Sequence, residues 1–133
     1  MRKRKANDVR VIQASKSNPQ KNEQVVSLLF YEQVFDTISF AYIEDEAHKV
    51  YITASNDKIA CMRIGESNTF CSFVLDESTP LIKDSEYGVH TFVSKTKQLS
   101  NEAGLFHVEY DLFMQDECVD TITMTWEIEN NEK

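Results

Sequence analysis

Glycine and proline are scarce in this chain, which has 3 Gly and 2 Pro among 133 residues. The sequence has no internal repeat and no low-complexity tract, and it has neither a glycine-rich phosphate loop nor a G-x-S-x-G elbow. No apolar run approaches the roughly 20 residues that a membrane-spanning helix needs. No apolar segment follows the basic N-terminus, as a secretory signal would require. We therefore expect a soluble, cytoplasmic protein.

Cysteine is also sparse, and its count is odd. The three cysteines, Cys61, Cys71 and Cys118, form no C-x-x-C motif. An odd count without a motif is typical of free thiols in a reducing compartment, and we predict that state. A hairpin would bring Cys61 and Cys71 face to face, so a redox pair is the alternative.

Positive charge is in deficit, with 14 Lys and Arg against 22 Asp and Glu. The first 21 residues are the exception, because they carry seven bases and one acid, Asp8. The remainder carries seven bases against 21 acids, a net charge of −14, which would repel a phosphate backbone. Nucleic acid is therefore not expected as a partner of the main body. Residues 1–7 are predicted to be a basic, flexible tail, and contact of this tail with nucleic acid or an anionic surface is the alternative.

What the chain does contain is a long alternation of apolar and polar residues near its C-terminus. Over 106–114 and again over 122–128, every second residue is apolar. A period of two predicts β-strands with one face in a core and the other in solvent. The polar run 115–117 between them predicts the turn of an antiparallel hairpin. The alternating apolar residues are Phe106, Val108, Tyr110, Leu112, Met114, Ile122, Met124, Trp126 and Ile128.

Shorter runs of the same kind predict about nine strands in all. A helix is an alternative only at 22–35, where apolar residues cluster. Successive hairpins leave a sandwich or a closed meander, and closure is favoured because it removes exposed sheet edges. The predicted fold is all-β: an antiparallel up-and-down β-barrel of eight or more strands over residues 8–129, with 130–133 as a flexible end. The predicted strands are 9–14, 25–31, 38–42, 50–54, 58–64, 69–75, 87–96, 106–114 and 122–128.

No group of residues carries a recognisable chemistry. The histidines His48, His90 and His107 share neither a helix face nor a ligand spacing, so no metal site is predicted. The acidic run 44–46 matches no calcium loop. No nucleophile can be paired with a base, so no catalytic residue is predicted. We expect a protein that is not an enzyme and needs no cofactor.

Arg63 is the most informative single residue, because it is the only arginine after residue 10 and alternates with Ile59 and Cys61. An interior guanidinium needs an acceptor, which the acidic group of a ligand would provide. The alternative is a position at the rim and an ion pair with an acid of a turn. The other candidates for a ligand site are side chains with a polar tip on predicted interior faces: His90, Thr96, Tyr110 and Trp126.

The chain carries FAYIEDE at 40–46, KVYIT at 49–53 and MRIG at 62–65, followed by Phe73, Gly88, Phe92, Thr96, Gly104, Tyr110 and Leu112. In order and spacing these motifs resemble the YwiB-like family of small bacterial proteins, over roughly residues 8–129. The resemblance implies a calycin-type, lipocalin-like β-barrel from a bacterial cytoplasm, with no assigned biochemical role. The Gly-x-Trp motif that lipocalins carry near the first strand is absent, since Trp126 lies in the last predicted strand.

These observations predict a cytosolic binding module whose barrel holds a small apolar or amphipathic ligand. The alternative is an interaction or regulatory protein with a packed barrel interior and no ligand. If Arg63, Thr91 and Thr96 point inward, binding is favoured. An interior of Phe, Leu and Met alone would favour the packed barrel.

Overall fold

The computed structural model describes residues 8–129, so the predicted flexible ends, 1–7 and 130–133, lie outside the described residues. Each strand pairs with the next in sequence, and β1 also pairs with β10, which closes the sheet. This arrangement confirms the predicted all-β, up-and-down barrel. No helix among residues 8–129 is long and apolar enough to cross a membrane. The ten strands are β1 (Asp8–Ser15), β2 (Asn22–Val34), β3 (Thr37–Asp45), β4 (His48–Ser55), β5 (Lys58–Gly65), β6 (Asn68–Val74), β7 (Ser78–Ser85), β8 (Gly88–Glu102), β9 (Leu105–Met114) and β10 (Glu117–Glu129).

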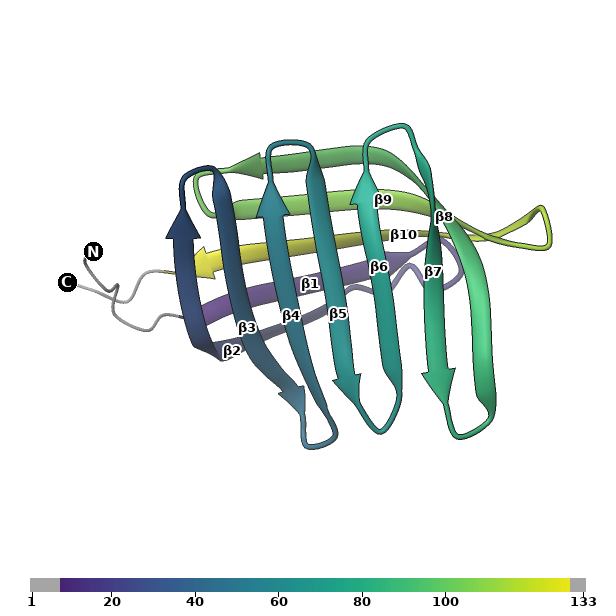
Figure 1. Ribbon diagram of the computed structural model, residues 1–133, viewed down its shortest axis with the longest axis horizontal. Helices are drawn as coiled ribbons and strands as arrows, with labels where there is room; N and C mark the ends of the chain where they lie inside the picture. Colours follow the sequence, from purple (N-terminus) through teal and green to yellow (C-terminus); the bar gives the residue numbers. More distant parts are fainter. Residues whose placement is uncertain (1–7, 130–133) are drawn as a thin grey trace.

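The barrel is flattened into two layers whose strands cross steeply (Figure 1). Strands β3 to β7 form one layer, and β1, β9 and β10 form the other. Strands β2 and β8, with 13 and 15 residues, are long enough to run from one layer into the other. Their pairing registers shift between Leu28 and Phe30 in β2 and between Thr96 and Gln98 in β8. Such β-bulges bend a strand, which lets one continuous strand serve both layers.

The predicted C-terminal hairpin is present as β9 and β10. Trp126 lies opposite Phe106 and Ile122 lies opposite Tyr110, so the two apolar faces coincide. The turn at 115–116 adopts left-handed backbone angles, with φ of 51° and 68°. Two successive residues with positive φ match the right-handed twist of the flanking strands.

Strand β7 differs from the sequence prediction, which had a loop at 76–80 and no strand between residues 75 and 87. Proline is rare inside sheets because it has no N–H to donate to a neighbour. Strand β6 pairs with β7 only over residues 81–84, so Pro80 needs no hydrogen bond on that side. Residues 78–80 of the predicted loop are therefore the start of an additional strand, while 76–77 stay outside it. The segment 22–35, where a helix was the alternative, forms β2.

Aromatic side chains close one end of the barrel. Phe40 and Phe106 are fully buried, with ring centroids 5.4 Å apart, and Tyr31 stacks on Phe40 at 6.5 Å. Farther along the same strands, the inward side chains of Tyr42 and Tyr110 border open volume. Ten strands enclose a wider interior than the eight that side chains can just fill. The barrel is therefore packed at one end and hollow at the other.

The packed end should carry most of the stability. Truncating Phe106 to Ala should lower the free energy of unfolding by about 3–5 kcal/mol, because a fully buried ring leaves a cavity. The matched control is Phe70→Ala, since Phe70 faces outward on β6 and is 36% exposed. Urea unfolding followed by circular dichroism should show a loss for Phe70→Ala of less than half that size. Equal losses would contradict the assignment of the interior face.

Candidate functional site

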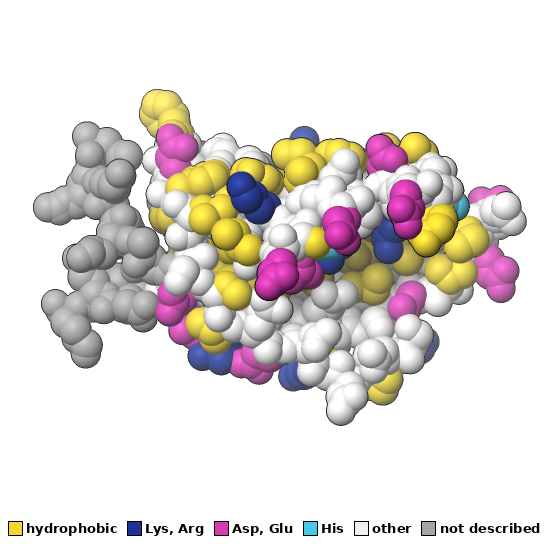
Figure 2. Space-filling model, turned by 90° about the horizontal axis from the view of Figure 1, so that it is seen from below, with side chains coloured by type: hydrophobic (Ala, Val, Ile, Leu, Met, Phe, Trp, Pro, Cys, Tyr) yellow, Lys and Arg dark blue, Asp and Glu magenta, His cyan; other side chains and the backbone are white. Residues whose placement is uncertain are grey.

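A cavity of about 370 Å³ occupies the hollow end of the barrel. It opens where β3, β5 and β7 end, and Figure 2 shows the hollow from that side. Its volume lies at the lower end of the range of about 300–1,000 Å³ typical of small-molecule sites. Every strand except β8 contributes to the wall: Val11, Gln13, Asn22, Gln24, Tyr42, Glu44, Val50, Cys61, Arg63, Thr69, Cys71, Phe73, Leu81, Lys83, Tyr110, Leu112, Ile122, Met124 and Trp126.

The lining changes from apolar to polar along the cavity. Buried rings and aliphatic groups, such as Phe73, Leu81 and Trp126, form its inner part. We call the polar lining residues the mouth of the cavity. An apolar interior beneath a polar opening suits a molecule with an apolar body and a polar head. The mouth consists of Gln13, Asn22, Gln24, Glu44, Arg63, Thr69 and Lys83.

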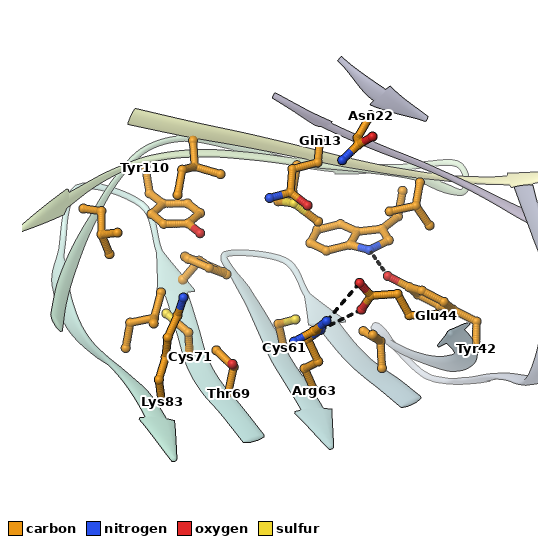
Figure 3. A pocket seen from close by; sticks show the side chains of 18 of the residues that line it. Gln13, Asn22, Tyr42, Glu44, Cys61, Arg63, Thr69, Cys71, Lys83 and Tyr110 are labelled. Atoms are coloured by element: carbon orange, nitrogen blue, oxygen red, sulfur yellow. Dashed lines mark hydrogen bonds and ion pairs between the residues drawn. The ribbon is translucent and has the colours of Figure 1, made fainter. Parts of the chain in front are cut away.

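Arg63 lies on the inner wall near the end of β5 and already has a partner (Figure 3). Its Nε and Nη2 donate to Oε1 and Oε2 of Glu44 at 2.7 and 3.2 Å. Asp45 Oδ2 lies 4.0 Å from Nη2. These hydrogen bonds to Glu44 raise the pKa of Arg63, and the two charges compensate each other. Arg63 therefore forms an ion pair with an acid of the run 44–46, as the alternative interpretation expected, although its side chain lies on the inner wall of the barrel.

Two turns beside this ion pair, 45–48 and 65–68, are held together and form what we call the clasp. The carbonyl of Ala47 accepts the backbone N–H of Glu66 at 3.2 Å. A Cβ built on Gly65 would overlap the Ala47 carbonyl oxygen and lie 2.9 Å from His48 Cδ2. Only glycine permits so close an approach of the backbone. The clasp thus fixes the ends of β3 and β5, which carry the ion pair.

Asp45 and His48 strengthen the clasp with side-chain bonds. Asp45 Oδ1 accepts the backbone N–H of Ala47 at 2.8 Å and lies 3.1 Å from His48 Nδ1. The second ring nitrogen, His48 Nε2, lies 3.3 Å from Ser67 Oγ. The bond from the Ala47 N–H, followed by the contact with His48, lowers the pKa of Asp45. Asp45 is therefore a carboxylate at neutral pH and belongs to the clasp.

Two tyrosines face the cavity, and only one of them has a hydrogen-bond partner within residues 8–129. Trp126 Nε1 donates to Tyr42 Oη at 2.9 Å, and both side chains are buried. Tyr110 is 7% exposed and packs its ring on Phe73, with centroids 4.6 Å apart. Its hydroxyl points into the cavity (Figure 3) and has no hydrogen-bond partner among residues 8–129. Burial raises the pKa of both phenols, so each remains a neutral donor at physiological pH.

Lys83 extends from β7 into the cavity (Figure 3). Its ammonium lies 5.8 Å from the centroid of the Phe92 ring, within reach of a cation–π contact. It forms no ion pair with a carboxylate in the part of the chain that the structure describes. By alternation, the adjacent Asp84 lies on the opposite face of the strand. Lys83 therefore brings uncompensated positive charge to the mouth.

Cys61 and Cys71 lie directly opposite each other on β5 and β6, and both face the cavity. Both are free thiols in the structure, as is the exposed Cys118. Cys71 Sγ lies 3.3 Å from Ser94 Oγ. Burial raises the pKa of Cys61 to about 12 and also raises the pKa of Cys71. The two cavity thiols are therefore protonated and weakly nucleophilic at neutral pH.

The structure brings together three of the five predicted site residues. Arg63, Tyr110 and Trp126 line the cavity, whereas His90 and Thr96 do not. Thr96 is fully buried beside Tyr110 in the register of β8 and β9, and its Oγ1 has no hydrogen-bond partner within residues 8–129. His90 lies opposite Lys83 and is exposed. Alternation gave the face of these two residues but not their depth along the barrel.

Sequence reasoning missed several residues of the cavity wall, above all Glu44, Lys83 and the two cavity cysteines. Glu44 was interpreted as part of a charged turn, although it follows Phe40 and Tyr42 at the spacing of two that marks one strand face. Lys83 follows Leu81 at the same spacing in the strand that was not predicted. Within residues 8–129, no three His, Cys, Asp or Glu side chains are grouped as metal ligands.

Comparison with known proteins identifies relatives of the chain. The family model described as "Domain of unknown function (DUF1934)" matches residues 9–125. Among solved structures, the ywiB protein from Bacillus subtilis is similar in fold, with a TM-score of 0.66 and 18% sequence identity. The similarity covers 93% of this chain and 90% of that chain. No curated protein sequence matches the chain. These findings confirm the resemblance to the YwiB-like family.

The close approach of the two turns in the clasp leads us to expect that one added methyl group at Gly65 destabilises the protein. Gly65→Ala should lower the free energy of unfolding by about 1–3 kcal/mol, because the backbone of Ala47 must move to admit a Cβ. Glu66→Ala, in the same turn, is the control, since it keeps the N–H that bonds to Ala47. Thermal unfolding should separate the two variants clearly. Equal melting temperatures would show that the two turns do not depend on this close approach.

The thiols should differ in reactivity. At pH 8, Cys118 should react rapidly with a thiol reagent such as 5,5′-dithiobis(2-nitrobenzoate), while Cys61 and Cys71 react slowly, because their raised pKa values leave little thiolate. Cys118→Ser should abolish the fast phase, and urea should convert the slow phase into a fast one. Three equally fast thiols in the folded protein would contradict the burial described here.

Proposed function

The chain belongs to the DUF1934 family, and we propose that it is a small binding module whose barrel cavity holds an amphipathic molecule. One observation carries the proposal: the cavity of about 370 Å³ joins a buried aromatic wall to a mouth of charged and amide side chains. A molecule with an apolar body and one polar end would satisfy both parts. Binding of such a molecule requires no catalytic group among the lining residues.

The character of the wall supports binding rather than catalysis. None of the lining residues is a histidine, and the two lining thiols are held protonated by burial. Nucleophilic catalysis needs an activated nucleophile within hydrogen-bond reach of a base. Glu44 is the one carboxylate among the described lining residues, and both of its oxygens already accept hydrogen bonds from Arg63. We therefore propose that the protein is not an enzyme.

The alternative, an interaction protein with a packed barrel, has less support. Arg63 and Thr96 face inward, while Thr91 is exposed on the opposite strand face. The interior thus contains polar groups and open volume, which a packed core would lack. The feature that favours the alternative is a cross-strand row of apolar side chains on the outside of β5 to β7: Met62, Phe70 and Ile82.

Native mass spectrometry of the protein purified from its own host tests the proposal. We expect a small mass that is retained in the folded protein and released on denaturation. Leu112→Trp should abolish retention, because the larger ring fills part of the cavity. Phe113→Trp is the matched control, because the adjacent side chain lies on the opposite face of the strand.

Circular dichroism should show that both variants are folded. If no mass is retained by the wild type, and no added amphipathic molecule binds to it, the packed-barrel alternative becomes the better account. Equal retention by both tryptophan variants would show that the ligand lies outside the barrel.

A further inference from the structure

Several polar groups of the cavity wall have no hydrogen-bond or ion-pair partner within residues 8–129, and two of them indicate the chemistry of the ligand. These two are the ammonium of Lys83 and the hydroxyl of Tyr110. We propose that the cavity takes a small carboxylic acid, whose carboxylate is bound by Lys83 and accepts a hydrogen bond from Tyr110. This inference rests on the proposed function and gives its ligand a chemical class.

Lys83 supplies the charge. Its side chain reaches from β7 into the cavity, and its contact in the structure is with the face of the Phe92 ring, at 5.8 Å. A cation–π contact leaves the N–H donors of the ammonium free to bind an anion. The exposed His90 lies opposite Lys83 in the register, and Asp84 lies on the outer strand face, so neither brings negative charge into the cavity at this point. An anionic group would meet an uncompensated cation here.

Tyr110 supplies the hydrogen bond. Only 7% of this residue is exposed, yet its hydroxyl has no partner in the described chain and points into the cavity (Figure 3). The hydroxyl oxygen is accessible from the cavity rather than enclosed, so an acceptor on a ligand can reach it and take its hydrogen bond. Tyr42 makes the contrast clear, because its hydroxyl accepts the N–H of Trp126 at 2.9 Å. A carboxylate oxygen is the strongest acceptor that an organic ligand commonly offers.

Arg63 is excluded from this role by its geometry. Both of its bonds to Glu44 run side by side, so the two charges compensate each other within the wall. A ligand carboxylate at Arg63 would have to displace Glu44 and leave that carboxylate without its partner. Lys83 can bind an acid without breaking any ion pair of the described chain.

The rest of the wall fits the apolar body of such an acid. Phe73, Leu112, Met124 and Trp126 line the cavity and offer no charge. A cavity of this size, at the lower end of the range for small-molecule sites, points to a short acid of about eight carbons as a probe. Trp126 is the single tryptophan of the chain, so its emission reports directly on occupation of the cavity.

The test compares octanoate with 1-octanol, which share an apolar chain and differ in charge. Titration into the full-length wild type, followed by Trp126 emission and by calorimetry, should show octanoate binding about tenfold more tightly, as a charge-assisted hydrogen bond implies. Lys83→Gln should abolish this preference, because octanoate loses its cationic partner. Lys95→Gln is the matched control, because this exposed lysine lies on the outward face of β8 and should not alter the preference.

Two further variants separate the roles within the wall. Tyr110→Phe should weaken octanoate by about threefold or more, since it removes one hydrogen bond from the carboxylate. The double variant Glu44→Gln with Arg63→Met removes the ion pair without leaving a lone charge. It should retain the preference for octanoate if Lys83 is the receiving group, and lose it if Arg63 is.

The outcomes distinguish this inference from the proposed function. Equal binding of octanoate and 1-octanol by the wild type, or an unchanged preference in Lys83→Gln, would overturn the acid class and leave the binding module intact. An unaltered octanoate affinity in Tyr110→Phe would overturn the part assigned to Tyr110. If neither compound binds and no mass is retained by native mass spectrometry, both the proposed function and this inference fail.

Discussion

Closure of the sheet between the first and last strands is the constraint on which the rest of the structure depends. Strand β1 pairs with β10 from Asp8 opposite Glu129 to Ser15 opposite Ile122, so the ring of ten strands has no free edge. Strand number sets the width of a barrel, and ten strands exceed what inward side chains can fill along the whole length. Phe40 and Phe106 close one end. The cavity at the other end is therefore a consequence of closure.

Much of this fold was predictable because most strands have one dry and one wet face. The alternation in β9 and β10 predicted the hairpin and the interior positions of Phe106 and Trp126. The prediction was wrong at β7. Pro80 is typical of a loop, and the charged Lys83 interrupts the apolar alternation that would have indicated an inward face. Both residues are tolerated for local reasons: Pro80 is unpaired on the β6 side, and Lys83 reaches the cavity rather than the core. Neither reason is visible without the tertiary pairing.

The candidate site was predictable only in part, because a period of two gives the face of a residue and not its depth. Arg63, Tyr110 and Trp126 were found, since each places a polar group on an apolar face. Thr96 shares that pattern yet is fully buried and does not line the cavity, and the exposed His90 does not line it either. The partner of Arg63 was not specified, because 44–46 was interpreted as a charged turn, although Glu44 continues the strand face of Phe40 and Tyr42.

The positive charge at the mouth would attract a small anion, whereas the net negative charge of the whole chain would repel a polyanion. Glu44 and Arg63 compensate each other, so Lys83 contributes an uncompensated charge to the mouth, on a chain whose formal net charge is −8. At physiological ionic strength, exposed charges are screened over about 8 Å, so an acid already at the mouth interacts mainly with Lys83. A polyanion spans many such lengths and meets the acidic surface as well. The same distribution of charge would thus admit a small acid with a single negative charge and disfavour a nucleic acid.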